Sequence, residues 1–589
     1  MLLIDNQKMH LIQRLIPFSR WLKGYRSEDF VNDSVAGIVV LFITVPQSIA
    51  YAFLAGLPAE MGLYAAIFAL IAYAGFGSSR SLAVGPTAII AMMTLEATSR
   101  FAIQGSPEFV VVAMKLAFLT GVILLLLRLI NFGAVISFLS HAVVTGFITA
   151  AAILIITNQI PAILGLSPAE ATEVWAVIPH IVSGITSSNL VVASVGISSI
   201  AFLWLCKTQA ESVLSRLFPR LSDTWLSAIV KSAPLYTVVL SICVVASFSL
   251  DVTKSVPVVG VIPSALPAMI FVMMSLQDVG LLAPSALLIA MVVFMESTSI
   301  GTAMASKRRE KIQPNQELIG LGVANVAASI GGGFPVAGSF ARTAINNSSG
   351  AVTPIASLVT AFLLIFSLIA FAGLFYYLPK AVLAAVIIMS AIHLIDIKDI
   401  QRTFVFNRTD AVTFTFTFFA VLGLGVESGI LVGIAISFVL LIRKSSKPHI
   451  AIVGRLPGTE HFRNVERHSV ETYSHVLSVR IDESLYFVNV RYIETFLLNK
   501  IADSEQLEHI LLICTATNFI DASGLEMLET LSDNLHAIGV TLHLAEVKGP
   551  VMDSLKDTAF LQNMTGELFL SADLGMKTLA NLKSTQSSA

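Results

Sequence analysis

The segment Gly331–Asn347 holds the residues whose types and spacing most strongly suggest chemistry. It is glycine-rich at its start, broken by Pro335, and carries one full charge, Arg342, inside otherwise apolar sequence. At membrane depth such backbone survives only where it is buried in protein or lines a cavity, because unpaired N–H and C=O groups are costly in lipid. A short helix starting near Phe340 would direct the N–H groups of Phe340, Ala341 and Arg342 into that cavity, where they favour an anion. We therefore predict an anion site in a membrane transporter.

A second candidate helix start is Val84-Gly-Pro-Thr87, which leads into another apolar stretch. Pro86 suits the beginning of a helix, and Thr87 adds a hydroxyl, so this helix could donate N–H groups toward the same centre. Taken alone, Gly-Pro-Thr usually marks a plain turn. Arg342 could complement the charge of a substrate, or its side chain could instead reach the cytoplasmic interface as an anchor.

Two further polar positions suggest substrate contacts and ion coupling. Pro46 interrupts an apolar run and places Gln47 and Tyr51 on one helix face. These side chains could contact the substrate, or they could belong to a proline kink with interhelical hydrogen bonds. Glu296 is the only acid between Pro284 and Ser306, so we expect it to face the bundle interior and either titrate or hold a cation. The alternative is a protonated glutamate bonded to a neighbouring helix.

The composition sets the class of protein and excludes several others. The chain has 589 residues, of which 55% are hydrophobic and only 13% are charged, which indicates an integral membrane protein. A net charge of -2 argues against a nucleic-acid partner. No catalytic triad, metal-ligand spacing or nucleotide-binding loop is evident, so we predict no enzyme activity, no cofactor and no metal.

Apolar runs of spanning length divide residues 33–443 into about fourteen membrane segments. Two of these, at the breaks described above, are short and lie third in each half, which predicts a 7+7 inverted repeat. Basic clusters at 207–231, 307–311 and 443–447 place both termini in the cytoplasm. We assign 1–32 to a cytoplasmic N-terminal segment, 444–473 to a linker and 474–589 to a cytoplasmic α/β domain with alternating strands and helices.

Several motifs together resemble the SulP sulfate-permease family, the relatives of pendrin and prestin. They are Ala55-Gly-Leu-Pro-Ala-Glu-Met-Gly-Leu-Tyr64, Phe76-Gly-Ser-Ser-Arg80 with Val84-Gly-Pro-Thr87, Glu296, and Phe340-Ala-Arg-Thr-Ala-Ile-Asn346. The resemblance implies an all-α polytopic domain with core and gate parts and an anion held between the third and tenth segments. By position, the site would include Gln47, Tyr51, Thr87 and the backbone at Phe340, Ala341 and Arg342.

The resemblance also implies that residues 474–589 form a STAS domain, that the protein is a homodimer, and that the STAS domain could bind a soluble partner. Ser523 occupies the place of a serine that is phosphorylated in related anti-sigma-factor antagonists. We expect it to act first as a helix N-cap. Ile300 stands where sodium-coupled relatives carry a hydroxyl residue, which favours a coupling proton over sodium. The compact STAS segment fits a bacterial inner-membrane protein.

We therefore predict a secondary active transporter of sulfate or a similar small anion, with proton coupling through Glu296 and elevator-like movement of the core against the gate. Bicarbonate or a dicarboxylate such as fumarate could use the same site. A nucleobase permease shares the architecture but would not require a STAS tail. A different class of function would be an anion-sensing membrane anchor whose STAS domain acts on a soluble partner.

Overall fold

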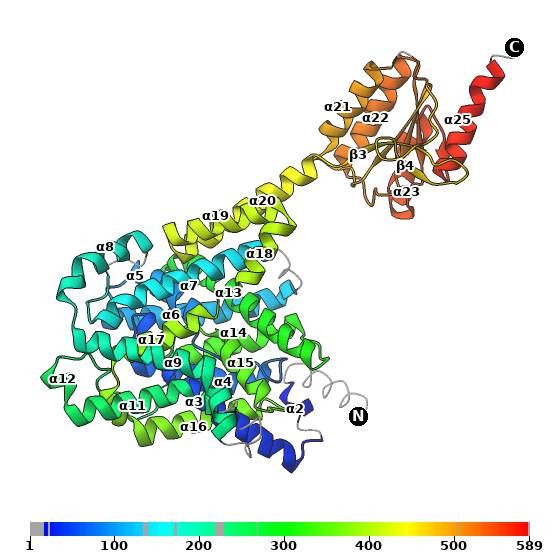
Figure 1. Cartoon of the computed structure of the whole chain (residues 1–589). Coiled ribbons are helices and arrows are strands. Elements are labelled where there is room, and N and C mark those ends of the chain that lie inside the picture. The colour runs from blue at the N-terminus through cyan, green and yellow to red at the C-terminus, as the bar shows by residue number, and fades with distance from the viewer. Residues whose placement is uncertain are drawn as a thin grey trace. The chain divides into compact units, whose positions relative to one another are not determined.

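The computed structural model describes residues 17–21, 24–133, 140–169, 173–217, 226, 229–267, 269–504 and 506–586. The chain divides into two compact units, Met1–Ala435 and Ile436–Ala589. Figure 1 shows that the first consists almost entirely of helices and that the second combines helices with a sheet. Each unit is described separately below.

The helices of the membrane unit follow the predicted apolar runs. Eight helices of the described residues are long and apolar enough to cross a membrane. Two helices outside the predicted spans, α8 (Val174–Gly184) and α18 (Ile397–Phe406), lie in connections. The helices that correspond to the predicted segments are α3 (Ser27–Leu54), α4 (Ala59–Phe76), α5 (Ala88–Ser99), α6 (Pro107–Leu129), α7 (His141–Leu164), α9 (Leu190–Leu217), α11 (Ala233–Phe248), α13 (Leu276–Lys307), α14 (Pro314–Ile330), α15 (Phe340–Ser348), α16 (Ile355–Phe371), α17 (Lys380–Ile392), α19 (Arg408–Leu424) and α20 (Val426–Ser446).

Helix packing in this unit repeats itself. If the helices from α3 to α11 in this set are matched in order with those from α13 to α20, the contacts occur in corresponding pairs. Thus the contact between α6 and α14 corresponds to the contact between α16 and α4. The contact between α3 and α16 corresponds to the contact between α13 and α6. Likewise α5 packs on α13 as α15 packs on α3, and α7 on α19 as α17 on α9. Two equivalent halves with an odd number of spans each have opposite orientations, as in an inverted repeat.

The C-terminal unit is a six-stranded sheet in the order β4-β3-β5-β6-β7-β8. The parallel part consists of β5 (Val476–Ile481), β6 (His509–Ile513), β7 (Thr541–Ala545) and β8 (Leu568–Phe569). Side chains alternate between the two faces of the sheet. Leu512 and Leu544 pack on the face covered by α21 (Val490–Ala502) and α22 (Ala522–Ala537), whereas Leu511 and Ile513 face α25 (Ala572–Gln586) (Figure 1).

Two details of this unit differ from the sequence-based expectation. The range 444–473, expected to be a linker, contains β3 (Ile450–Arg455) and β4 (Phe462–Asn464), which extend the sheet beyond β5. The edge strand β4 has only three residues, too few for a clear periodicity, and β3 lies between β4 and β5. The N-cap of α22 is Asp521, not Ser523, because the Asp521 carboxylate accepts the Gly524 N–H at 2.8 Å. Aspartate and serine are equally good caps, so sequence alone could not choose between them.

Candidate anion site

The centre of the membrane unit is a pair of two-residue strands, each followed by a short helix. Strands β1 (Val84–Gly85) and β2 (Ala337–Gly338) pair antiparallel, with Val84 opposite Gly338. Helix α5 follows β1 after Pro86 and Thr87, and α15 follows β2 after Ser339. The two breaks that the sequence placed in separate halves therefore lie side by side, although Val84 and Gly338 are 254 positions apart in the chain.

Both helices begin with free backbone donors. The Thr87 carbonyl accepts the Ala91 N–H at 2.9 Å, and the Ser339 carbonyl accepts the Thr343 N–H at 2.9 Å. The three N–H groups that follow each cap residue have no carbonyl partner within their own helix. Neither the Thr87 nor the Ser339 side chain caps its own helix. The positive ends of α5 and α15 are thus available to an anion.

Polar side chains from neighbouring helices fix this crossing. The Gly338 N–H donates to Ser297 Oγ of α13 at 2.8 Å. Asn325 of α14 accepts the Val336 N–H at 2.9 Å and donates to the Val336 carbonyl at 3.0 Å. Neither residue is part of the site predicted from the sequence. The sequence does indicate both as candidates, since Ser297 follows Glu296 directly and Asn325 is a polar amide inside an apolar span.

Arg342 is fully enclosed at the start of α15. Its side chain is 1% exposed, and its Nη2 donates to the Pro86 carbonyl at 2.6 Å. Its Nε and Nη1 are buried and have no hydrogen-bond partner among the described residues. A Cβ on Gly85 would lie 3.0 Å from Nη1, so glycine at that position lets the guanidinium approach the β1 backbone. The burial of Arg342 is incompatible with an interfacial anchor.

Two other predicted side chains lie near this guanidinium, and a third, Gln47, bonds to Ser390, which also interacts with Tyr51. Glu296 of α13 and Tyr51 of α3 are both close enough to Arg342 for electrostatic interaction. Glu296 Oε2 is buried and has no partner within the described part of the chain. Gln47 donates from Nε2 to Ser390 Oγ of α17 at 3.3 Å, while its Oε1 has no such partner. These groups therefore surround one location with unused polar atoms.

The remaining predicted positions contribute in different ways. Thr87 is buried, and its Oγ1 has no partner among the described residues. Phe340 and Ala341 have exposed side chains, so only their backbone N–H groups belong to the polar centre. Ser523 lies in the other unit, partly buried in the first turn of α22. Within the described residues, no group of three or more His, Cys, Asp or Glu side chains is placed to hold a metal ion.

Comparison with known proteins agrees with this architecture. A family model described as the sulfate permease family matches residues 30–417, and a STAS domain model matches residues 467–574. The chloroplastic sulfate transporter 4.1 of Arabidopsis thaliana is 34% identical over 532 residues, which cover 88% of this chain and 76% of the relative. A probable sulfate transporter of Mycobacterium tuberculosis (strain CDC 1551 / Oshkosh) is 30% identical over 547 residues, covering 92% of this chain and 93% of the relative.

Solved structures show the same fold. SLC26A9 matches with a TM-score of 0.88 at 22% identity, covering 99% of this chain and 95% of that one. The transmembrane domain of the cyanobacterial bicarbonate transporter BicA matches with a TM-score of 0.58 at 18% identity, covering 70% of this chain and 98% of that one. Fold and comparisons together define a multi-pass membrane transporter with a C-terminal STAS domain, not an enzyme. The chain belongs to the sulfate permease family.

Proposed function

We propose that this protein transports sulfate or a dianion of similar size, held between the N-termini of α5 and α15. The observation that carries the proposal is the convergence of two uncapped helix ends on a buried arginine with unused donors. Buried polar groups are normally hydrogen-bonded, so several orphaned atoms at one location indicate a missing ligand. The names of the relatives, which include sulfate transporters of plants and a mycobacterium, support the choice of substrate.

Proton coupling is the second part of the proposal. Glu296 is the acid nearest this centre on α13, and its interaction with Arg342 links its charge to the occupancy of the site. When Glu296 is protonated, its negative charge no longer offsets the positive charge of Arg342. An anion beside Arg342 is then bound more strongly. Symport then follows from loading both ligands on one side and releasing both on the other. The residue at 300 is isoleucine, so this position offers no hydroxyl ligand to sodium.

The proposal also includes the movement of the helices, the membrane in which the protein lies, and its partners. The elevator-like movement would shift one group of helices against the other, which an inverted repeat allows. We place the protein in a bacterial inner membrane with both termini in the cytoplasm, in agreement with the basic loops. We further propose that it is a homodimer and that its STAS domain binds a soluble partner, with Ser523 as a possible phosphorylation site.

Uptake into liposomes tests this function. Purified protein should accumulate labelled sulfate when the outside is more acidic than the inside, and an imposed sodium gradient should not replace the proton gradient. Unlabelled sulfate, bicarbonate, fumarate, oxalate and chloride should then be compared as competitors and as stabilisers of the detergent-solubilised protein. Competition by bicarbonate or fumarate but not by sulfate would change the substrate. The absence of uptake of every anion, with ligand-dependent stabilisation retained, would favour a sensor.

A further inference from the structure

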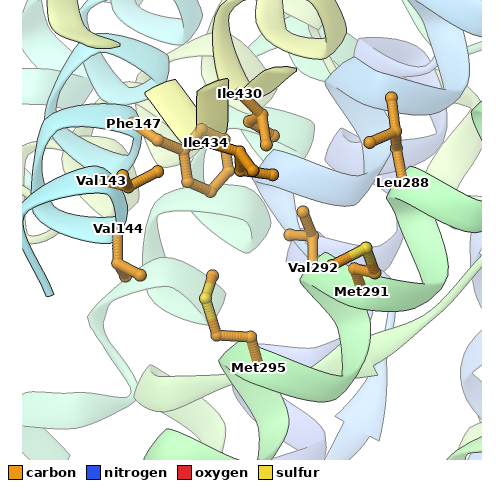
Figure 2. A pocket seen from close by; sticks show the side chains of 9 residues that line it. All are labelled: Val143, Val144, Phe147, Leu288, Met291, Val292, Met295, Ile430 and Ile434. Atoms are coloured by element: carbon orange, nitrogen blue, oxygen red, sulfur yellow. The ribbon is translucent and has the colours of Figure 1, made fainter. Parts of the chain in front are cut away.

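An apolar cleft separates α20 from α7 and α13. Figure 2 shows its lining, with Leu288, Val292 and Met295 of α13 on one side and Ile430 and Ile434 of α20 on another. Val143, Val144 and Phe147 of α7 complete it, together with Met291. All of the lining side chains are apolar, so they form no hydrogen bonds across the cleft.

A polar cluster lies directly beyond one end of this cleft. Arg100, which follows α5, forms ion pairs with Glu96 at 3.1 Å and with Glu427 of α20 at 2.8 Å. Glu96 Oε2 also accepts the Val426 N–H at 2.8 Å and the Glu427 N–H at 3.3 Å, so it caps α20. Ser285 of α13 donates to Glu427 at 3.2 Å. We call Glu96, Arg100, Ser285 and Glu427 the latch.

The latch and the cleft share the same helix faces. On α20, Ile430 and Ile434 follow Glu427 at spacings of three and seven residues, and on α13, Leu288 and Val292 follow Ser285 at the same spacings. The latch therefore closes the end of the cleft. Along α13, Ser285 is about 16 Å from Glu296 at the helical rise of 1.5 Å per residue. The latch thus ties α20 to the far end of α5, whose other end carries Thr87.

The latch joins a buried acid to a half-exposed arginine, since the Arg100 side chain is 48% exposed. Glu427 is 3% exposed, and its Oε1 is buried with no partner among the described residues. Gly425 has a φ of +87°, and a Cβ there would lie 2.8 Å from Glu96 Oε1, so glycine permits this close approach. Breaking one partner away from a buried charge is costly, which makes such a contact suited to holding one of two states.

We propose that the latch is a gate which holds α5 against α20 in this state, and that it must open in every transport cycle. This inference rests on the proposed function, because it assigns positioning residues to the anion site at the opposite end of α5. Opening would release α5 from α20, and closing would restore the ion pairs. The geometry places this gate at the end of α13 away from the basic segment at its C-terminus, Lys307 to Lys311.

Reversible cross-linking tests whether the latch opens. In a background with Cys206, Cys243 and Cys514 replaced by serine, Arg100→Cys and Glu427→Cys would be joined with a short, cleavable bifunctional thiol reagent. Locking the two helices should lower liposome uptake at least about tenfold, since a locked protein cannot change state, and reduction should restore it. The matched control joins Lys115→Cys to Asp278→Cys, a 2.9 Å ion pair between α6 and α13, which pack side by side. Cross-linking this pair should leave most of the uptake.

The outcomes separate the gate from the transport function. Full cross-linking of the Arg100/Glu427 positions with unchanged uptake would overturn the gate. No uptake by the unmodified protein would instead contradict the proposed function, and the gate would then be judged by labelling. Ser285→Cys should react with a membrane-impermeant thiol reagent several-fold faster when combined with Arg100→Gln, while Ser329→Cys, buried between α14 and α6, should not change. Equal labelling of Ser285→Cys with and without Arg100→Gln would also reject the gate.

Discussion

Two acids on consecutive helices have buried carboxylate oxygens in opposite hydrogen-bonding environments. Glu317 of α14 is 0% exposed and accepts hydrogen bonds from the Tyr73 hydroxyl at 2.7 Å, from the Ser78 N–H at 2.8 Å and from the Ser78 hydroxyl. Glu296 of α13 has a buried Oε2 with no partner among the described residues. Burial alone therefore does not identify a functional acid in this protein. Our proposal of Glu296 as the coupling acid depends instead on the hydrogen bonds, because a satisfied carboxylate is fixed and an unsatisfied one can exchange partners.

The same contrast applies to the whole membrane unit. Asp33, which is also 0% exposed, accepts from the Val352 and Thr353 N–H groups and from the Thr353 hydroxyl, and so fixes the start of α16 to α3. Gln47, Thr87, Glu296 and Arg342 are instead among the residues whose buried polar atoms have no partner in the described part of the chain. Asp33 and Glu317 thus join helices through several hydrogen bonds each, whereas Glu296 Oε2 has no such partner among the described residues.

The largest expected effect is the loss of coupling in Glu296→Gln. This change removes the titratable group but keeps the shape of the side chain, so sulfate uptake should no longer respond to a proton gradient. The free energy of unfolding should change by less than about 1 kcal/mol, because no hydrogen bond to Oε2 is lost. Uptake at several outside pH values, together with thermal denaturation, measures both. If sulfate uptake by Glu296→Gln still depended fully on the proton gradient, Glu296 would not be the coupling acid, and it would not differ from Glu317 in function.

The converse substitution is Glu317→Ala, which should reduce stability. It leaves Tyr73 and Ser78 donors buried without an acceptor, which costs about 2–4 kcal/mol. The protein should denature several degrees lower in detergent. The fraction that remains folded should still show proton-dependent uptake. A variant with normal stability and lost coupling would assign Glu317 the role proposed for Glu296.

A smaller effect is expected at Thr87. Thr87→Val keeps the volume but removes the hydroxyl, whose Oγ1 has no partner among the described residues. If this hydroxyl contacts the anion, the Kd for sulfate should rise by about fivefold, which corresponds to one ordinary hydrogen bond. Isothermal titration would measure the change. Ser339→Ala is a matched control at the other helix start, and equal affinity of Thr87→Val and the unmodified protein would exclude Thr87 from the site.

In the C-terminal unit, the titration of the histidine His543 should change the stability of the protein without a role in transport. Burial, with a smaller contribution from His509, lowers the pKa of His543 to about 4. In the unfolded chain the histidine pKa is about 6.5, so the unfolded chain binds this proton more readily than the folded one. The free energy of unfolding should therefore be constant above about pH 6.5 and fall as the pH decreases from about 6.5 to about 4. Hydrogen exchange of β7 in the full chain, corrected for the intrinsic rate, would report the loss. His543→Gln should weaken this pH dependence, and an unchanged profile would contradict the assignment.

Much of the architecture follows from the sequence for simple physical reasons. Apolar runs of about 20 residues must form membrane-spanning helices, because lipid offers no partners to the backbone. The breaks before Ala88 and Phe340 were visible because glycine and proline interrupt these runs. The weak points were short edge strands such as β4, and the cap of α22, where Asp521 and Ser523 have similar preferences.

By itself, then, the sequence determined a membrane transporter with two broken helices, an acid at membrane depth and an α/β domain. Only the tertiary structure decided that Arg342 is buried against Pro86, that Glu317 is satisfied, and that Glu96 and Arg100 meet Glu427. The physical reason is that these contacts join residues hundreds of positions apart. Local periodicity reports which face of a helix is apolar, whereas the partner of a buried polar atom depends on which helix lies opposite it.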